Sequence, residues 1–319
     1  MIIYQAQLPA IGDQAQTQVM LQGSTGGAPI LGAIWCIDQV GVLLACADNN
    51  IKKWDLTSNQ VVNVGSHSQP VKDLYMFHQN NQIVVVSGGW DARVKFWTWA
   101  NPNQLNQIGE SYLGKPIHYM SGEFPLLVTA HSEMFIHYWD LKNIFSGNFN
   151  PQGVTTSPLK NTTTCIQCFA DGKGYAIGSI EGRCGIKYID LANNKLNLND
   201  DFCFKSHRIE EAPPSSVPVK VFAVNGLTFN RTFNTFATYG QDGCYFFWNK
   251  DTKSKLKSTK AAPWPVTAAD YLENATMFAY SFGYDWGKGA EEAKKQQYPV
   301  KIYIRKVKED EAFKRSTGK

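Results

Sequence analysis

The fold is decided by a stretch, IVVVSGGWDARVKFW, at residues 83–97. Its apolar run, Ile83–Val86, leads into a turn that holds Asp91, and Trp97 follows the acid six residues later. A short carboxylate suits a tight turn because it accepts backbone N–H bonds, and a large ring packs well between neighbouring sheets. The stretch therefore predicts two strands joined by a tight turn.

The same pattern of apolar run, acidic turn and aromatic residue occurs at four other places. These are Asp48 with Trp54, Glu133 with Trp139, Glu181 with Tyr188, and Asp242 with Trp248. The five aromatic residues lie 43, 42, 49 and 60 residues apart, and Tyr303 continues the series 55 residues further on. Such intervals are typical of a propeller, in which a four-stranded blade needs neighbours to bury its faces. We therefore expect an all-β WD-repeat β-propeller.

The number of blades depends on the two ends of the chain. Two early strands, Ile2–Gln7 and Gln16–Gln22, resemble the third and fourth strands of a blade that lacks its first two. The last blade has three strands and ends with Val300–Val307. We favour a seven-bladed plan with an incomplete first blade. In the alternative, Ile2–Gln7 pairs with Val300–Val307 and closes a six-bladed ring.

Composition indicates one domain. The chain has 319 residues, of which 43% are hydrophobic and 13% aromatic, which is ample for a packed core. No charged or low-complexity linker divides it, so we expect a single β-propeller over residues 1–319. The Pro/Ser-rich stretch Ala212–Pro218 is interpreted as an inter-blade loop, and residues 308–319 as a basic C-terminal tail.

Cysteines and short motifs argue against several classes of protein. The seven cysteines do not form a secreted disulfide framework, and the pair Cys165 and Cys168 has no second pair to complete a zinc site. The N-terminus has no signal peptide pattern, and no apolar run is long enough to span a membrane. No catalytic or nucleotide-binding motif is found, and His67, which precedes a blade, is expected to hold backbone. We expect a non-enzymatic soluble protein of a reducing compartment, without metal, cofactor or membrane insertion.

Four runs resemble a known family. They are Gly178-Ser179-Ile180-Glu181-Gly182-Arg183, Phe204-Lys205-Ser206-His207-Arg208, Ala223-Val224-Asn225-Gly226-Leu227-Thr228-Phe229 and Tyr284-Asp285-Trp286-Gly287-Lys288-Gly289. They are similar to the mRNA-export WD-repeat family of the nuclear pore, the RNA-export-one or Gle-two type. The first three also resemble its sister, the spindle-checkpoint WD-repeat family, whereas the fourth is typical of the export type. The resemblance covers about residues 28–307.

The resemblance implies a binding platform for an acidic segment. Members of the family hold a GLEBS-type segment of a Gly-Leu-Phe-Gly nucleoporin, and by position Arg183 and Arg208 would meet its glutamates, with Lys205 beside them. A guanidinium offers a planar fork for a carboxylate, worth roughly 1.5–3 kcal/mol for each charge-assisted pair. The alternative for Arg183 is a turn residue that merely pairs with Glu181.

The resemblance also implies an exposed aromatic and basic edge that contacts nucleic acid, at Phe247, Trp286 and Lys288. An exposed tryptophan can stack on a base while a neighbouring lysine contacts phosphate. Phe247 stands next to Trp248 in a predicted strand, so one of these two rings should belong to the core. Trp286 lies in a loop framed by glycines, where burial is harder to arrange.

The basic charge is confined to the last quarter of the chain. The formal net charge is +4, but residues 250–319 hold 15 Lys and Arg against 9 Asp and Glu, which leaves 16 against 18 for residues 1–249. Lys253, Lys255 and Lys257 alternate along one predicted strand. They either protect an exposed strand from pairing or attract RNA without reading its sequence.

These features together predict a nuclear-pore adaptor in mRNA export. Its partners would be the nucleoporin segment and RNA or messenger ribonucleoprotein, and it would lie at the nuclear envelope with cytoplasmic shuttling. One alternative keeps the fold and replaces the partner with a checkpoint kinase. Another is a generic WD-repeat subunit of a ubiquitin-ligase or signalling complex, which leaves the insertion Tyr284–Gly289 unexplained.

Overall fold

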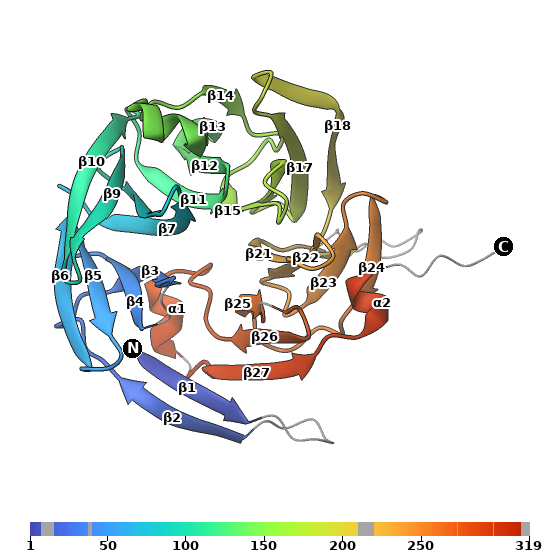
Figure 1. Cartoon of the computed structure of the whole chain (residues 1–319). Coiled ribbons are helices and arrows are strands. Elements are labelled where there is room, and N and C mark those ends of the chain that lie inside the picture. The colour runs from blue at the N-terminus through green and yellow to red at the C-terminus, as the bar shows by residue number, and fades with distance from the viewer. Residues whose placement is uncertain (8–15, 38–39, 210–219, 273, 296, 314–319) are drawn as a thin grey trace. The chain divides into compact units, whose positions relative to one another are not determined.

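Antiparallel strands make up most of the regular structure in the computed structural model of the chain (Figure 1). The structure describes residues 1–7, 16–37, 40–209, 220–272, 274–295 and 297–313. Contacts divide the chain into two compact units, Met1–Thr155 and Thr156–Lys319, called the first and second unit below. The expected loop Ala212–Pro218 and the tail from residue 314 onward lie outside the described residues.

The first unit is built from one two-stranded sheet and three four-stranded sheets. The two-stranded sheet pairs β1 (Ile2–Gln7) with β2 (Gln16–Gln22). The four-stranded sheets are β3 (Ile30–Trp35), β4 (Gly41–Cys46), β5 (Asn50–Asp55) and β6 (Gln60–Ser66); β7 (Val71–Gln79), β8 (Gln82–Gly89), β9 (Arg93–Asn101) and β10 (Gln104–Tyr112); and β11 (Ile117–Glu123), β12 (Leu126–His131), β13 (Phe135–Asp140) and β14 (Gly153–Thr156). Short 3-10 turns, Ser132–Met134 and Leu141–Ser146, flank β13.

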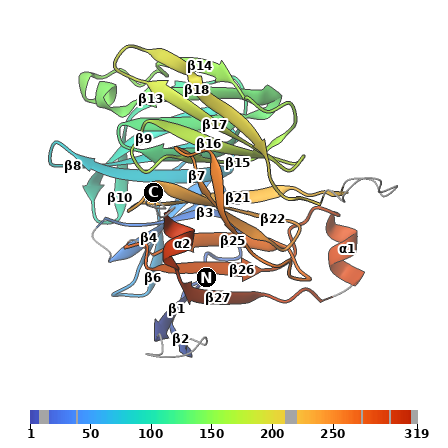
Figure 2. The same cartoon turned by 90° about the vertical axis from the view of Figure 1, so that its right-hand side faces the viewer.

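The second unit repeats this architecture. Its sheets are β15 (Thr163–Cys168), β16 (Gly174–Ser179), β17 (Arg183–Asp190) and β18 (Lys195–Lys205); β21 (Val224–Asn230), β22 (Thr235–Gly240), β23 (Tyr245–Asn249) and β24 (Ser254–Ser258); and β25 (Val266–Tyr271), β26 (Met277–Phe282) and β27 (Lys301–Lys306). A small hairpin pairs β19 (Arg208–Ile209) with β20 (Lys220–Val221). Two short helices, α1 (Ala290–Lys295) and α2 (Glu309–Ala312), precede and follow β27, which runs beside β26 in Figure 2.

The described residues therefore contain six blades of up-and-down strands, five with four strands and one with three. The all-β β-propeller class predicted from the repeated stretches is confirmed. Six is the number that the alternative closure required, but the pairing of Ile2–Gln7 with Val300–Val307 that it also required is not found among the described strands, where β27 pairs with β26. The strands β1 and β2 pair with each other, and the preference for a seventh, incomplete blade stays a prediction, as does the single-domain boundary.

Buried side chains between blades form the cores of both units. In the first unit, Trp97 packs with residues of β4 and β7, and Trp139 packs with residues of β8 and β9. Trp54 belongs to a cluster that also includes Met1 and Leu21, so the β1–β2 sheet covers the outer face of β4 as a neighbouring blade would. In the second unit, Trp248 packs on residues of β15 to β22. The tryptophans thus pack between sheets, as predicted.

The blade formed by β15 to β18 departs from the expected pattern. In the blade of β7 to β10, Trp97 follows Asp91 by six residues and pairs with Val85. In the blade of β15 to β18, the residue six positions after Glu181 is Lys187, which pairs with Tyr175. Tyr188 comes one residue later, so its ring lies on the opposite face of the strand. There it packs against Phe169, with ring centroids 5.1 Å apart. Lys187 is buried and pairs with Asp201 at 2.5 Å.

The end of the chain also differs from the expected basic tail. Residues 309–312 form the acidic helix α2, which packs on β24 and β23. Glu311 pairs with Arg305 at 2.7 Å, and Asp310 pairs with Lys257. The Arg305 guanidinium also lies over the rings of Tyr245 and Phe247. The first half of the predicted tail is therefore an acidic segment that packs against the sheet and pairs with the half-buried Arg305.

Candidate functional site

The turn between β16 and β17 brings the predicted arginines together. Its central residue, Gly182, has a φ of +62°, and a Cβ there would lie 2.8 Å from the carbonyl oxygen of Ser206 and 3.0 Å from that of His207. A hydrogen bond of 2.9 Å from the Ser206 backbone N–H to the Gly182 carbonyl holds this approach. Only glycine permits both the left-handed backbone and the close contact. The turn therefore places Glu181 against the segment that carries Arg208.

Glu181 is the shared partner of both arginines. Arg208 donates from Nε and Nη2 to the Glu181 carbonyl oxygen, at 3.0 and 2.7 Å. The Glu181 carboxylate Oε2 lies 3.9 Å from Arg208 Nη2 and 3.8 Å from Arg183 Nε. The pairing of Arg183 with Glu181, the alternative interpretation of that arginine, is therefore present. Arg183 retains 37% of its side-chain exposure and remains accessible to a second carboxylate.

A pocket of about 260 Å³ opens beside the arginine pair, and we call it the basic aromatic pocket. It is lined by Lys205, Ser206, His207, Arg208, Phe246, Trp248 and Lys255. The Lys255 ammonium lies 5.4 Å from the centre of the Phe246 ring and 5.9 Å from that of Trp248. Lys205 pairs across the sheet with Arg183. The pocket combines cations with aromatic faces, which suits an anion attached to apolar atoms.

A buried hydrogen-bond network fixes one wall of this pocket. His207 Nδ1 lies 2.8 Å from Asp242 Oδ1, and its Nε2 lies 3.1 Å from the Thr238 hydroxyl. The Trp248 indole N–H donates to the same hydroxyl at 3.0 Å. Since both ring nitrogens of His207 have partners, the histidine holds its neighbour Arg208 in a defined place.

The first unit contains the same network with serine in place of threonine. His67 Nδ1 lies 2.9 Å from Asp91 Oδ1 and its Nε2 lies 2.7 Å from the Ser87 hydroxyl, which also accepts from Trp97 Nε1 at 2.8 Å. Burial alone would raise the pKa of Asp91, but hydrogen bonds from His67 and from the N–H groups of Ser68 and Arg93 outweigh it and lower this pKa. The sequence suggested that the His67 ring binds backbone groups, whereas the structure shows it bound to the side chains of Asp91 and Ser87.

The expected exposed role of Phe247 is wrong. Its side chain has 0% exposure and packs in the core formed with Tyr245, Val266 and Phe278. Side chains alternate along a strand, so Phe246 and Trp248 share the opposite face and line the basic aromatic pocket. Alternation predicted that one of the neighbouring rings is core, and the structure shows that it is Phe247. The same alternation could have identified Phe246 as the pocket residue.

Trp286 is exposed, as expected from its glycine-framed loop. Its side chain keeps 64% exposure, with a φ of +60°, and its ring lies 5.3 Å from that of Tyr284. Tyr284 stacks on Tyr298 at 4.3 Å and donates its hydroxyl to the Gly289 carbonyl. Lys288 is exposed in the same loop. The loop is thus supported from within, and it presents an indole and an ammonium to the surroundings.

The lysines of β24 and of the turn before it have different environments. Lys253 lies 5.0 Å from the centre of the Phe202 ring, and Lys255 faces the basic aromatic pocket. Lys257 pairs with Asp310 of α2, and this pair raises the pKa of the Lys257 ammonium. The predicted RNA-binding strand is therefore partly neutralised by the chain itself, because α2 lies against one of its three lysines.

No helix among the described residues has the length and hydropathy needed to cross a membrane. Within the same described ranges, no three side chains of His, Cys, Asp or Glu gather in a way that could hold a metal ion. No disulfide joins any two of the seven cysteines, all of which lie in the part of the chain that the structure describes. The expectations about metal and cofactor stay predictions.

Six blades of antiparallel strands with repeated His, Asp, Ser or Thr and Trp networks define a WD-repeat β-propeller, and one of its pockets has a cationic lining. A family model described as "WD domain, G-beta repeat" matches residues 58–98, which span β6, β7, β8 and most of β9. Relatives of known name are more specific. The chain belongs to the mRNA export factor family of the Rae1 and Gle2 type.

Three relatives carry this assignment. The chain is 36% identical to "mRNA export factor rae-1" of Caenorhabditis elegans over 289 residues, which cover 89% of this chain and 74% of the relative. It is 33% identical to "mRNA export factor GLE2" of Chaetomium thermophilum over 309 residues, covering 97% and 82%. It is 34% identical to "Protein Rae1" of Drosophila melanogaster over 271 residues, covering 84% and 74%. The family resemblance of the four sequence runs is thus confirmed.

Proposed function

We propose that the protein is a non-enzymatic adaptor in mRNA export that binds an acidic GLEBS-type segment of a nucleoporin at the basic aromatic pocket. The observation that carries this proposal is the arginine pair at Glu181. Arg208 already takes the backbone carbonyl of Glu181, whereas Arg183 only approaches the carboxylate, at 3.8 Å, which is longer than a hydrogen bond. An incoming glutamate can replace that long contact with a shorter one. The names of the relatives support the export role.

The charges around the pocket favour an acidic partner. Lys205, Arg208 and Lys255 line it, and Arg183 stands across the sheet from Lys205. Glu181 is the carboxylate that contacts the arginines among the described residues, so the cations outnumber it. Complementary charge accelerates encounter and excludes basic partners. We place the protein at the nuclear envelope with cytoplasmic shuttling, because a nucleoporin segment would hold it there.

We further propose that the loop with Trp286 and Lys288 contacts RNA. A closely packed set of aromatic rings supports this loop, and the exposed indole offers a face for base stacking. A side chain added at Gly287 would come within 2.5 Å of Gln241 Nε2, so the loop lies against the β22–β23 turn that also carries Asp242. The proposed RNA surface and the wall of the basic aromatic pocket therefore share one turn.

A calorimetric titration tests the partner. The full chain is titrated with a GLEBS-type nucleoporin peptide and, in parallel, with the corresponding checkpoint-kinase segment, each at about 50 and about 200 mM salt. Tight binding of the nucleoporin peptide that weakens with salt, together with weaker binding of the kinase segment, supports the export adaptor. The reverse preference would favour the checkpoint role, and a folded sample that binds neither peptide would contradict both.

A further inference from the structure

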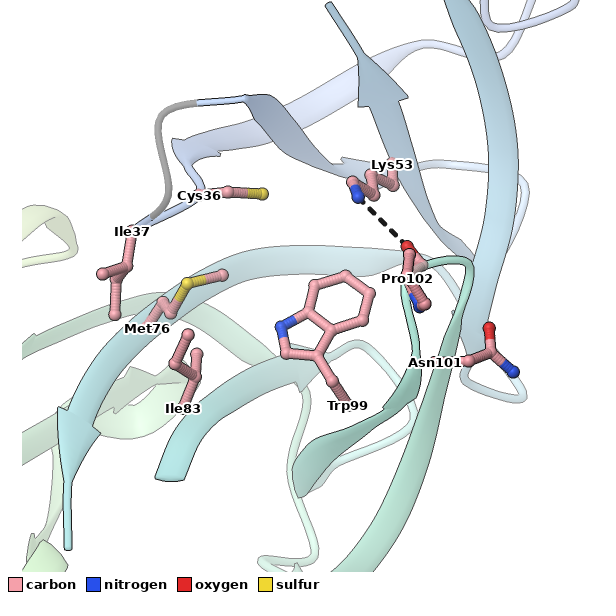
Figure 3. A pocket seen from close by; sticks show the side chains of 8 residues that line it. All are labelled: Cys36, Ile37, Lys53, Met76, Ile83, Trp99, Asn101 and Pro102. Carbon is pink, nitrogen blue, oxygen red and sulfur yellow. Dashed lines mark hydrogen bonds between the residues drawn. The ribbon is translucent and has the colours of Figure 1, made fainter. Parts of the chain in front are cut away.

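The first unit contains a second pocket, which no part of the proposed function uses (Figure 3). It has a volume of about 280 Å³ and lies between the blade of β3 to β6 and the blade of β7 to β10. Cys36, Met76, Ile83 and Trp99 form its apolar walls, and Ile37 lies at its edge with 45% exposure. We call it the rim pocket. Its size is close to the lower end of ordinary ligand sites, so it suits one or two neighbouring side chains of a peptide.

One wall of the rim pocket carries a buried ammonium group. Lys53 on β5 is 6% exposed, donates from Nζ to the Pro102 carbonyl at 3.0 Å and lies 5.3 Å from the centre of the Trp99 ring (Figure 3). An ammonium has three N–H donors, so this carbonyl uses one of them. No salt bridge joins Lys53 to a carboxylate among the described residues.

The nearest acid on the same strand is already engaged. Asp55 Oδ1 accepts from the N–H groups of Thr57 and Ser58 and from the Ser58 hydroxyl. These bonds lower the pKa of Asp55, and the charge of Lys53 lowers it by a smaller amount. A buried cation with unused donors is costly unless an anion approaches it. The Lys53 side of the pocket therefore favours a negatively charged ligand.

The Trp99 indole provides a second donor. Figure 3 shows its nitrogen on the side of the ring that faces Met76 and Ile83, within the pocket. Among the described residues no hydrogen bond involves Trp99 Nε1. An indole N–H is a donor only, so its complement is an acceptor on the ligand. The pocket thus offers two donors above an apolar floor.

We propose that the rim pocket binds a segment of a partner protein that presents an apolar side chain next to a carboxylate. The apolar side chain would lie on Met76 and Ile83, and the carboxylate would accept from Lys53 Nζ and Trp99 Nε1. The occupant is a polypeptide, since further exposed apolar residues stand close in sequence to the pocket residues Cys36 and Ile37, at Trp35 and Val40. This site lies in the first unit and does not depend on the arginine pair of the second.

The test uses short capped peptides and the full chain labelled with ¹⁵N at tryptophan. The probes are acetyl-Leu-Glu-amide and acetyl-Glu-Leu-amide, and each is compared with its glutamine counterpart of equal size. The Trp99→Phe variant assigns the Trp99 indole signal among the nine tryptophans. We expect this signal to move with the glutamate peptides at about millimolar concentration, as ligands of this size bind weakly. The glutamine peptides should bind about tenfold more weakly.

A neighbouring lysine supplies the matched control. Lys52 stands next to Lys53 on β5, is also buried and donates to the Thr25 carbonyl at 2.7 Å, but it does not line the rim pocket. Lys53→Met should remove the preference for glutamate over glutamine, and Lys52→Met should keep it. An unmoved Trp99 signal, or equal shifts with glutamate and glutamine peptides, would overturn the proposal. If Lys53→Met fails to fold, the comparison of glutamate and glutamine peptides on the unsubstituted chain still tests the proposal.

Discussion

Glu181 gives Arg183 and Arg208 a carboxylate before any partner arrives. Its backbone carbonyl fixes Arg208 by two hydrogen bonds, whereas its side chain only approaches the two guanidinium groups at 3.8 and 3.9 Å. The backbone contact serves the fold, and the longer side-chain contacts are weak and exchangeable. The two roles of Glu181 can therefore be separated by substitution.

The Arg183→Glu variant should lose the acidic segment without losing the fold. The new like charge beside Glu181 and the partner's glutamates should cost about 2–5 kcal/mol of binding, because it opposes a desolvated contact. Arg183 is more than one third exposed, so the melting temperature should change little. Calorimetry measures the binding and circular dichroism measures the melt.

A matched control exists for this substitution. Arg93 follows Asp91 by two residues, as Arg183 follows Glu181, and it pairs with Glu110 in the first unit. Arg93→Glu should leave the affinity for the segment unchanged. A strong fall of the melting temperature with Arg183→Glu alone would show that Arg183 is a structural residue.

Removing the charge of Glu181 should strengthen binding. In Glu181→Gln the backbone carbonyl still holds Arg208, but the carboxylate no longer competes with the partner for the guanidinium groups. The gain should be about 0.5–1 kcal/mol, the usual value of a partly exposed ion pair. Titration of both proteins with the same nucleoporin peptide measures it. Weaker binding would mean instead that the Glu181 carboxylate orients the arginines.

Among the structural elements, β22 and β23 are joined by a buried hydroxyl, that of Thr238. Thr238 accepts from Trp248 Nε1 at 3.0 Å and contacts His207 Nε2 at 3.1 Å. Thr238→Val keeps the shape and leaves both nitrogen atoms without their partner. It should lower the free energy of unfolding by about 1–3 kcal/mol, which urea denaturation measures.

The network in the first unit gives an independent comparison. Ser87→Ala removes the hydroxyl that His67 and Trp97 share there, and it should cost a similar free energy. Only Thr238→Val should also weaken binding of the acidic segment, because only its histidine precedes Arg208. If both variants weakened binding equally, the loss would come from general destabilisation.

The strands of the blades were predictable because their signals are local. The apolar run, the acidic turn and the ring all lie within IVVVSGGWDARVKFW, and β8 and β9 appear there. The face of Tyr188 was not predictable, because Lys187 takes the tryptophan position and its burial depends on Asp201 of another strand. The docking of α2 likewise depends on Lys257, which is distant in the sequence and comes close only in the folded chain.

The candidate site was predictable in part. Arg183, Lys205 and Arg208 were identified by resemblance, and the structure brings them together around Glu181 and the basic aromatic pocket. The role of Lys255 there was missed, since it requires the cross-strand pairing of Lys255 with Trp248. Such a pairing depends on register, and a bulge between Phe247 and Trp248 shifts the register at this place.

For the whole molecule, the stability of the chain should depend on pH through His131. Burial, followed by the charge of His137, lowers the pKa of His131 to about 4. The unfolded chain binds a proton near its ordinary pKa of 6.5, so between pH 6.5 and 4 the unfolded state holds more protons. Stability is then present above pH 6.5 and is lost as the pH falls through this window, by roughly 3 kcal/mol in total.

Urea denaturation at several pH values measures this loss. His131→Gln should flatten the dependence between pH 6.5 and 4, where the histidine of the parent chain resists protonation. His78 lies on β7 of another blade, is exposed and is not among the groups that lower the pKa of His131, so His78→Gln should leave the slope as it is. An unchanged slope with His131→Gln would assign the effect to other groups.

The distribution of charge over the molecule sets the expected response of RNA binding to salt. Lys257 is paired with Asp310, whereas no salt bridge joins Lys253, Lys255 or Lys288 to a carboxylate in the part of the chain that the structure describes. Three phosphate contacts to a single strand should give a slope of log affinity against log salt of about −2.

Single substitutions separate these contributions. Lys288→Gln should reduce the magnitude of the slope by about 0.7, and Lys257→Gln should change it little, because α2 already neutralises that lysine. Fluorescence anisotropy with a single-stranded oligouridine measures both. A large effect of Lys257→Gln with none of Lys288→Gln would contradict the placement of RNA at the Trp286 loop.

The two copies of the buried network differ in the residue that comes directly after the histidine. Ser68 stands after His67, and Arg208 stands after His207. The buried histidine, aspartate and hydroxyl of each network keep the backbone in place in both blades, while the residue after the histidine can vary in chemistry. Blades of one propeller can therefore diverge in their recognition through a change at the residue after the histidine, while the buried network stays in place. In evolutionary terms, the blades can inherit one common fold while the binding specificity of each blade changes separately.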